Sequence, residues 1–220
     1  MKVFCVIPAW NEEKNIFKVV EGAKKYVDEV VVVSDGSTDR TLELAREAGA
    51  VALEHFVNRF QGASLETGNQ YALSNGADII IHFDADGQMM AEDIPEMVAP
   101  IIRGEADAVF GSRFLGKETD MPWMKKNIIF PLAHLFNRVF FGVKMTDPQS
   151  GFRAMSARAW EKIKIENDDM AHTSEILAKA FKNKLRIKEV PVKIVYHHFG
   201  QKFSGGFIII KDMLLWKMTK

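Results

Sequence analysis

Three short runs of consecutive apolar residues constrain the fold of this chain more than any other feature. They occupy residues 3–7, 30–33 and 79–81, and in none of them do apolar and polar residues alternate. Strands that are apolar at every position are typical of parallel sheets whose two faces are both covered. The pattern therefore predicts a sheet buried between two layers of helices.

The segments between these runs predict the helices. We expect Asn11 to be the N-cap of a first helix, with two glutamates in its first turn, where carboxylates suit the helix dipole. Ser37 or Thr38 is expected to cap the next helix, which would end before Gly49. The later elements are expected as strand 50–56, helix 63–75, strand 79–83, helix 92–103, strand 108–111, helix 173–182, strand 187–196 and helix 207–218. Strands that alternate with helices indicate an α/β fold with a mostly parallel sheet and helices on both faces.

Length and composition limit the class of protein. With 220 residues we expect one large domain over residues 1–206, followed by an apolar C-terminal helix over 207–220. Lys plus Arg equals Asp plus Glu, at 29 each, so there is no bulk electrostatic argument for a nucleic-acid partner, and we expect none. The single cysteine, Cys5, lies in an apolar run and reads as a small buried residue in a reducing compartment.

Localisation follows from the apolar segments. The first residues lack the pattern of a secretory leader, and no segment approaches the ~18 apolar residues of a membrane-spanning helix. We therefore expect a cytoplasmic protein. Residues 128–143 and 207–218 lack a clean polar face, which indicates core packing or shallow contact with the cytoplasmic face of a membrane. Trp216 suits a membrane interface, and a membrane partner subunit is an alternative.

Polar clusters follow the expected strands at the points where these end. They occupy residues 9–12, 34–39, 84–88 and 111–113. In open parallel sheets, ligands bind beyond the carboxyl ends of the strands. The four clusters therefore predict one binding site at this edge of the sheet.

The cluster Asp84-Ala85-Asp86 carries the clearest chemistry. Two carboxylates one residue apart can bind one hard cation such as Mg²⁺ or Mn²⁺, and Gln88 can add a neutral oxygen. Such a cation neutralises a diphosphate leaving group, and the small Ala85 allows a ligand to approach closely. The alternative is a solvated acidic turn.

The first two clusters suit a nucleoside. Asp35 can accept hydrogen bonds from a base or a ribose, and Gly36 permits close approach of the backbone; a helix-capping turn is the alternative. Ala9 beside Trp10 suits a flat base. Glu12 can contact base edges or can simply favour the start of a helix.

Taken in order, these segments resemble the successive signatures of glycosyltransferase family 2. The signatures lie at residues 8–13 (PAWNEE), 34–39 (SDGSTD) and 84–88 (DADGQ). Residues 61–63 are similar to a further glycine-containing segment of that family, and residues 111–113 and 147–153 fit its dolichyl-phosphate mannosyltransferase-like branch. The resemblance covers residues 3–206.

The resemblance implies a GT-A fold and an inverting transfer from a nucleotide-sugar. The nucleotide-binding residues that it implies are Pro8, Ala9, Trp10, Glu12, Asp35, Gly62, Asp84 and Ala85. It places Asp84, Asp86 and Gln88 at the metal and the diphosphate, and Asp86 also among the catalytic residues. The family usually has two adjacent acidic residues where this chain has Ser34-Asp35, which leaves UDP and GDP both open as the donor nucleotide.

The acceptor is expected to meet positively charged and hydroxyl side chains. These are Arg113, Lys126, Ser150, Arg153 and Lys202, because guanidinium groups in particular suit a phosphate. The branch is expected to have arginines in the loop after Arg113, where this chain has Lys125-Lys126.

The chemistry of the acceptor decides whether a general base is needed. A phosphate oxygen is already anionic, whereas a saccharide hydroxyl needs a base, for which Glu175 is the candidate. The alternative for Glu175 is a helix-start carboxylate or an ion-pair partner of an arginine such as Arg153. Our leading hypothesis is therefore an enzyme, with catalytic residues Asp86 and Arg113, that transfers a hexose from a UDP- or GDP-sugar to a polyprenyl phosphate or other envelope glycan precursor. The alternatives are transfer to a saccharide hydroxyl by Glu175, and a non-catalytic subunit that binds nucleotide-sugars.

Overall fold

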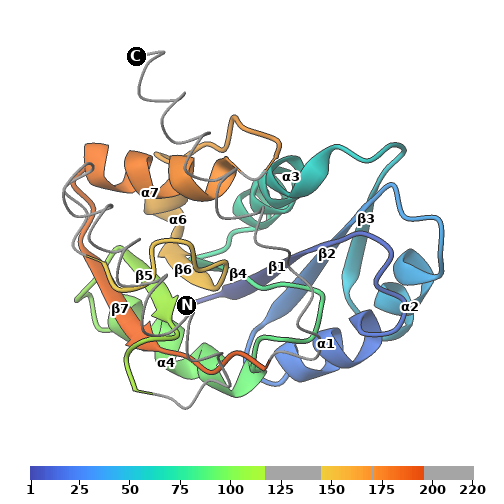
Figure 1. Cartoon of the computed structure of the whole chain (residues 1–220), viewed down its shortest axis with the longest axis horizontal. Coiled ribbons are helices and arrows are strands. Elements are labelled where there is room, and N and C mark those ends of the chain that lie inside the picture. Colours follow the sequence, from blue (N-terminus) through green and yellow to red (C-terminus); the bar gives the residue numbers. More distant parts are fainter. Residues whose placement is uncertain (117–144, 170, 196–220) are drawn as a thin grey trace, which may run out of the picture.

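The centre of the molecule is a mixed, mostly parallel sheet (Figure 1). The computed structural model describes residues 1–116, 145–169 and 171–195, and within them seven strands form one sheet in the order β3-β2-β1-β4-β6-β5-β7. The strands are β1 (Val3–Ala9), β2 (Glu29–Asp35), β3 (Val51–His55), β4 (Ile79–His82), β5 (Ala108–Ser112), β6 (Arg153–Ser156) and β7 (Ile187–Pro191). The predicted α/β class is confirmed.

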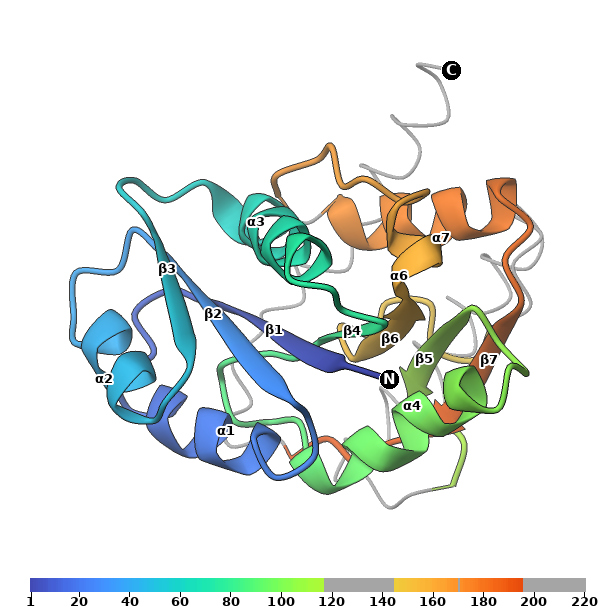
Figure 2. The same cartoon turned by 180° about the vertical axis from the view of Figure 1, so that it is seen from behind.

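Helices cover both faces of this sheet, as the two opposite views show (Figures 1 and 2). One face carries α1 (Ile16–Ala23), α2 (Thr41–Glu47), the short 3-10 helix η1 (Ala91–Asp93) and α4 (Ile94–Ile102). The other face carries α3 (Phe60–Ser74), α6 (Ala157–Trp160) and α7 (His172–Lys182). None of the helices in the described part of the chain is long and apolar enough to cross a membrane.

The continuous apolar strands are explained by two separate cores. Along β1, Cys5 and Ile7 pack toward α1 and α4, whereas Phe4 and Val6 pack toward α3 and α7. All four side chains are fully buried, and each large one contributes roughly 1.5–3 kcal/mol of hydrophobic stabilisation. Burial also raises the pKa of the Cys5 thiol far above its usual range, which agrees with the predicted inert, buried role.

Strand β6 was not predicted from the sequence. It runs antiparallel between β4 and β5, and pairs His82 with Arg153 across the first of these contacts. Arg153, the last residue of the segment 147–153, begins this strand and is buried. The strand has four residues and starts with a charged one, so it carries no apolar run that could reveal it.

The predicted helix caps were wrong. Helix α1 begins at Ile16 rather than after Asn11, and α2 begins at Thr41 without a cap from Ser37 or Thr38. Asn11 instead joins two loops: its Oδ1 accepts a hydrogen bond from the Thr38 N–H (2.8 Å), and its N–H donates to Ser37 Oγ (3.1 Å). Asn11 adopts a left-handed φ of 55°, which asparagine tolerates better than most residues. These polar side chains therefore hold the site loops together.

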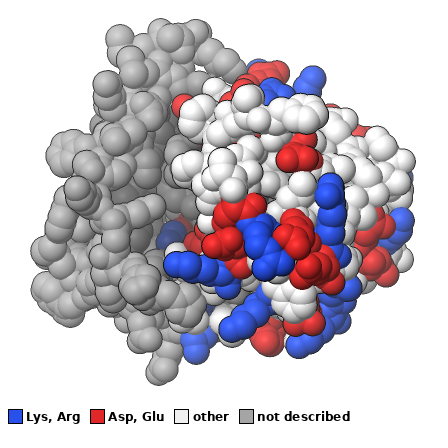
Figure 3. All heavy atoms as spheres, turned by 90° about the vertical axis from the view of Figure 1, so that its right-hand side faces the viewer, with Lys and Arg blue, Asp and Glu red and all other residues white. Residues whose placement is uncertain are grey.

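Charges of both signs occur on the face of the molecule that Figure 3 shows. On the face shown in Figure 3, lysines and arginines are interspersed with aspartates and glutamates, in agreement with the equal numbers of the two signs. The predicted division after residue 206, the apolar segments 128–143 and 207–218, and Trp216 lie outside the described residues.

Candidate active site

The loops that follow β1, β2 and β3 are tied to one another beside the carboxyl ends of these strands. The β1 loop is joined to the β2 loop through Asn11. The β2 loop packs on the β3 loop at Gly36, where a Cβ atom would lie 2.6 Å from the Asn58 backbone nitrogen. Because Gly36 also has a φ of 66°, glycine is required here both for space and for conformation.

Asp35, at the end of β2, is buried and held by the protein. Its Oδ1 atom accepts hydrogen bonds from His55 Nδ1 (2.7 Å) and from the Arg59 backbone N–H (2.9 Å). His55 is fixed in turn by Thr67 Oγ1 on α3, 2.9 Å from its Nε2 atom. Sequence reasoning missed His55, although it ends β3 directly opposite Asp35, and the rule that polar residues at strand ends mark the site could have found it.

Asp84 and Asp86 follow the fully buried strand β4 after Phe83. Asp84 is partly buried, and its Oδ1 atom accepts a hydrogen bond from Gln61 Nε2 at 3.1 Å. Asp86 Oδ1 accepts from the Gln88 backbone N–H at 2.9 Å, across a turn in which Gly87 has a φ of 72°. The turn thus brings the predicted metal ligands of this segment to one loop.

The electrostatics of Asp84 are unusual for a carboxylate. Burial, and then the neighbouring negative charge of Asp86, raise the pKa of Asp84 to about 6. The charges of Arg153 and Arg113 and the hydrogen bond from Gln61 act in the opposite direction. A cation that binds beside this carboxylate would favour its charged form.

The carboxylates of Asp84 and Asp86 fit a divalent cation that takes its other ligands from water and a diphosphate. Among the described residues, no group of three or more His, Cys, Asp or Glu side chains could hold a metal by itself. Asp84 and Asp86 can supply carboxylate oxygens, and water and diphosphate oxygens commonly complete the shell of Mg²⁺. Gly151 keeps this side of Asp84 open, because a Cβ atom there would lie 3.0 Å from Asp84 Oδ2.

Arg153 lies in the interior, close enough to Asp84 for the two charges to affect each other. It is only 1% exposed, and it donates hydrogen bonds to the Ser150 carbonyl oxygen (2.9 Å) and to Thr173 Oγ1 (3.2 Å). Burial lowers the pKa of Arg153 to about 10, against the opposing effect of Asp84, and the group stays charged near neutral pH. The structure thus gives Arg153 an electrostatic influence on Asp84, while its contact with the acceptor phosphate stays a prediction.

A second buried layer supports this arrangement. His82 Nε2 lies 2.9 Å from Asn69 Oδ1, and the His82 ring stacks on Trp160 with centroids 4.4 Å apart. Burial, then the positive charge of Arg153, hold the pKa of His82 well below its usual value, so the ring is neutral. His82 therefore adds no second positive charge beside Arg153.

Arg113 begins the loop after β5 and is paired with Asp147. Its Nε and Nη2 atoms lie 2.6 and 2.7 Å from the two oxygens of the buried Asp147 carboxylate. This two-point contact fixes the guanidinium plane. Ser150, also predicted at the acceptor, is buried in the same segment, and its hydroxyl donates to the Phe152 carbonyl oxygen.

Glu175 is a structural carboxylate. It accepts hydrogen bonds from the Glu166 and Asn167 backbone N–H groups and from Asn167 Nδ2, and it forms an ion pair with Lys179 Nζ at 2.6 Å. Burial alone would raise the pKa of Glu175, but the hydrogen bonds from Lys179 and Asn167 lower it below its usual value. Both oxygens are used and the group resists protonation, which speaks against the predicted role of a general base. The predicted ion-pair alternative describes it better, with Lys179 as the partner instead of Arg153.

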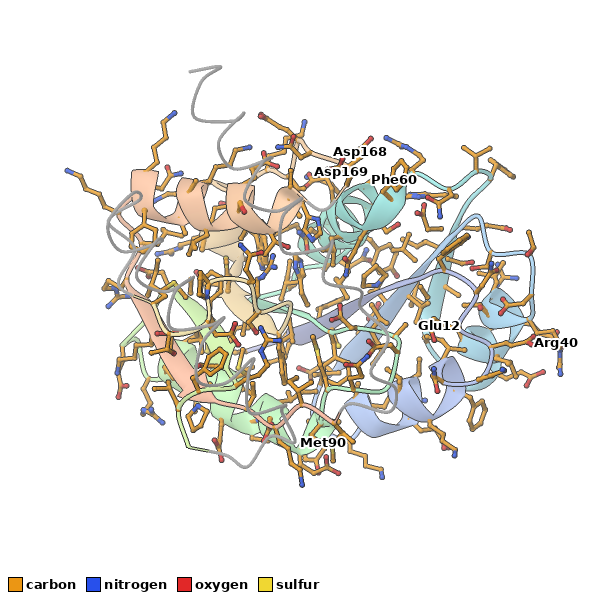
Figure 4. The ribbon with its side chains drawn as sticks, in the orientation of Figure 1. Glu12, Arg40, Phe60, Met90, Asp168 and Asp169 are labelled. Atoms are coloured by element: carbon orange, nitrogen blue, oxygen red, sulfur yellow. The ribbon has the colours of Figure 1, made fainter. Side chains whose placement is uncertain are left out.

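The other predicted residues are distributed as follows. Pro8 and the buried Ala9 end β1. The loop that follows carries Trp10, which is 58% exposed. It also carries Glu12, labelled in Figure 4, whose carboxylate accepts a hydrogen bond from Asn15 Nδ2 at 2.9 Å. Ala85 is buried between the two aspartates. Lys126 and Lys202 lie outside the described residues.

Gly62 packs against the protein itself. A Cβ atom at this position would lie 2.0 Å from the Asn167 carbonyl oxygen, and its N–H donates to the Asp168 carbonyl oxygen at 2.6 Å. The loop over residues 165–169 thus fills the space that a side chain would need. This packing accounts for a glycine at position 62 without any contact to a nucleotide.

Comparison with known proteins identifies the family. The sequence matches the family model described as Glycosyl transferase family 2 over residues 4–164. The chain belongs to glycosyltransferase family 2. The predicted family, the GT-A type of fold and the enzyme class of glycosyltransferase are thereby confirmed.

Named relatives of this family 2 glycosyltransferase act on lipid phosphates. It is 33% identical to the UDP-N-acetylglucosamine–dolichyl-phosphate N-acetylglucosaminyltransferase of Methanococcus voltae, over 99% of this chain and 97% of the relative. It is 28% identical to the undecaprenyl-phosphate mannosyltransferase of Micrococcus luteus, over 94% and 90% of the two chains. These names support the predicted dolichyl-phosphate-like branch of the family.

Solved structures with the same fold contain a nucleotide and a divalent cation. Glucosyl-3-phosphoglycerate synthase from Mycobacterium tuberculosis, crystallised with Mg²⁺ and UDP, aligns with a TM-score of 0.70 at 22% identity. The alignment covers 93% of this chain and 73% of that chain. At this identity, the likeness establishes the fold alone.

Proposed function

We propose that this glycosyltransferase transfers a hexose from a UDP- or GDP-sugar to a polyprenyl phosphate, with inversion and with a bound Mg²⁺ or Mn²⁺. The observation that carries the proposal is the loop of Asp84 and Asp86 at the end of a buried strand, with Gln61 and Arg153 beside Asp84. The lipid-phosphate acceptors in the names of its relatives support the choice of acceptor.

Asp84 and Asp86, with Gln88 beside them, are the residues that would hold the cation. When bound, the cation supplies positive charge that stabilises the departing nucleoside diphosphate. Asp35 has a different proposed role, at the nucleoside. Its carboxylate is fixed by His55 and can accept a hydrogen bond from a base or a ribose. Pro8, Ala9, Trp10 and Glu12 complete the proposed nucleoside end of the site.

The state of Glu175 favours a phosphate acceptor over a hydroxyl. An anionic phosphate oxygen attacks the anomeric carbon while the bond to the diphosphate breaks, and no proton has to be removed from the acceptor. Glu175, which would be the base for a hydroxyl, is already saturated with hydrogen bonds. Arg113, oriented by Asp147, is proposed to lie beside the acceptor phosphate and to act in catalysis. Such an acceptor would place the reaction at the cytoplasmic face of a membrane.

The acceptor is tested by offering the phosphate and the alcohol of the same lipid. With a UDP- or GDP-sugar and Mn²⁺, we expect a glycolipid product from polyprenyl phosphate and none from polyprenol. Glu175→Gln should keep transfer per folded molecule within a few-fold of the wild type, while stability falls by about 1–3 kcal/mol because buried hydrogen bonds are weakened. Glu166→Gln, which changes the exposed second partner of Lys179, should alter neither.

Two results would contradict this account. Transfer to polyprenol, together with an inactive but stable Glu175→Gln variant, would establish a hydroxyl acceptor and a catalytic base. Tight binding of nucleotide-sugars without transfer to any acceptor would indicate the non-catalytic subunit instead.

A further inference from the structure

Phe60 combines an exposed aromatic ring with a backbone conformation that suits glycine. Its φ is 67°, and its side chain is 60% exposed at the start of α3. A left-handed φ is an outlier for a bulky residue, and glycine would make the same turn without steric cost. A role for the ring outside the fold would account for a phenylalanine at this position.

The turn explains the backbone of Phe60 but not its ring. The Phe60 N–H donates to Asn58 Oδ1 (3.0 Å), and its carbonyl oxygen accepts from Ser64 Oγ (3.2 Å). Both contacts use main-chain atoms of residue 60, so a glycine would keep them. The ring is mostly exposed and adds little to the hydrophobic core.

The neighbours of Phe60 point to what the ring could contact. The residue before it, Arg59, donates its backbone N–H to Asp35, and the residue after it, Gln61, donates its side-chain amide to Asp84. Phe60 thus lies between contacts to the proposed nucleoside end and the proposed diphosphate end of the donor site. Figure 4 shows it at the start of α3, near Asp168 of the loop that packs against Gly62.

We propose that Phe60 is a further donor-binding residue whose ring packs against the nucleoside of the nucleotide-sugar. A flat apolar ring is suited to stack on a base or to cover a ribose, and the contact would be made only when the donor is bound. This inference rests on the proposed function, because it requires a nucleotide-sugar in the site.

The test compares variants of two exposed phenylalanines, Phe56 at the start of the loop between β3 and α3 and Phe60 directly after it. Phe56, which is 97% exposed and is not among the residues with positive φ, is the matched control for Phe60. The measurements are the Kd for UDP and for GDP with Mn²⁺, by calorimetry, and the Tm of the protein without ligand. Phe60→Gly should bind the preferred nucleotide about tenfold more weakly, as expected for a lost stacking contact, with an unchanged or higher Tm because strain is relieved. Phe60→Trp should keep most of the affinity, and Phe56→Ala should change neither quantity.

The outcomes separate this inference from the proposed function. Equal Kd values for Phe60→Gly and the wild type, or equal losses in Phe60→Gly and Phe60→Trp, would overturn the inference and leave the proposed function standing. A clearly lower Tm in Phe60→Gly would also overturn it, since the ring would then serve packing. Absence of nucleotide binding by the wild type would overturn both.

Discussion

At the scale of single residues, the site is organised by the charge on Asp84. Its carboxylate lies between the negative Asp86 and the buried positive Arg153, in a position partly removed from water. The pKa of about 6 shows that the burial and the aspartate outweigh the arginines in the protein without a ligand. A bound cation would reverse this balance and favour the charged form.

The raised pKa of Asp84 predicts a pH dependence for metal-supported donor binding. Below about pH 6 a proton competes with the cation, so the Kd for a nucleotide-sugar with Mn²⁺ should rise up to about tenfold per pH unit, and it should be flat above about pH 7. Calorimetry between about pH 5 and 7.5 measures this. A nucleotide-sugar is used because its diphosphate does not titrate in that range. The same Kd at both ends would contradict the assigned environment of Asp84.

The effect of pH on folding stability through Asp84 is opposite in sign to its effect on donor binding. Without a cation, the folded protein binds a proton on Asp84 more tightly than the unfolded chain, whose aspartates have pKa values near 3.8. This group therefore makes the folded state less stable as the pH rises from about 4 to about 6. Binding of the cation removes that penalty, because the carboxylate is then needed in its charged form.

At the scale of elements, the sequence predicts every strand of the described sheet except β6, the strand that makes both antiparallel pairings. The runs at β1, β2 and β4 are visible because both of their faces are buried, and the polar clusters at their ends mark the site. Strand β6 is invisible because it is short and begins at Arg153. The caps at Asn11 and Ser37 were misassigned because the same side chains that can cap a helix can equally bind a neighbouring loop.

For Glu175 the sequence offered both a catalytic role and an ion pair, and for Arg153 it did not indicate burial, for a related reason. A charged residue near a helix start or in a polar motif reads the same whether it faces a ligand or the protein. The i,i+4 spacing on one helix allows the pair of Glu175 with Lys179, but only the tertiary structure shows the other hydrogen bonds of Glu175 and the burial of Arg153. The missed contact of His55 with Asp35 likewise depends on the register of two strands.

The contact between α3 and the 165–169 loop gives a prediction with a matched control. Gly62→Ala should destabilise the protein by about 1–3 kcal/mol, because the new methyl group would lie 2.0 Å from the Asn167 carbonyl oxygen. Gly22→Ala, also within a helix, meets only Ala91 Cβ at 3.4 Å and should stabilise by about 0.5–1 kcal/mol through helix propensity. Urea denaturation measures both free energies of unfolding. Equal effects of the two substitutions would contradict the described packing of α3.

At the scale of the whole molecule, the site draws on segments far apart in the sequence. The antiparallel strand β6 inserts between β4 and β5 and so brings Gly151 and Arg153 beside Asp84. The loop after β3 leads into α3, whose Gln61 donates a hydrogen bond to Asp84, so earlier and later segments of the chain meet at this aspartate. A donor site built in this way depends on the complete sheet rather than on one motif.

The most direct test of the central claim is the metal-dependent transfer rate of Asp86→Asn. With polyprenyl phosphate, a UDP- or GDP-sugar and saturating Mn²⁺, we expect this variant to lose at least about a hundredfold in rate with an unchanged Tm, because a ligand of the charge-stabilising cation is removed. Glu92→Gln, an exposed carboxylate on η1, is the control and should be fully active. A folded Asp86→Asn variant that transfers sugar at the wild-type rate would contradict the claim that Asp84 and Asp86 form the metal and diphosphate site.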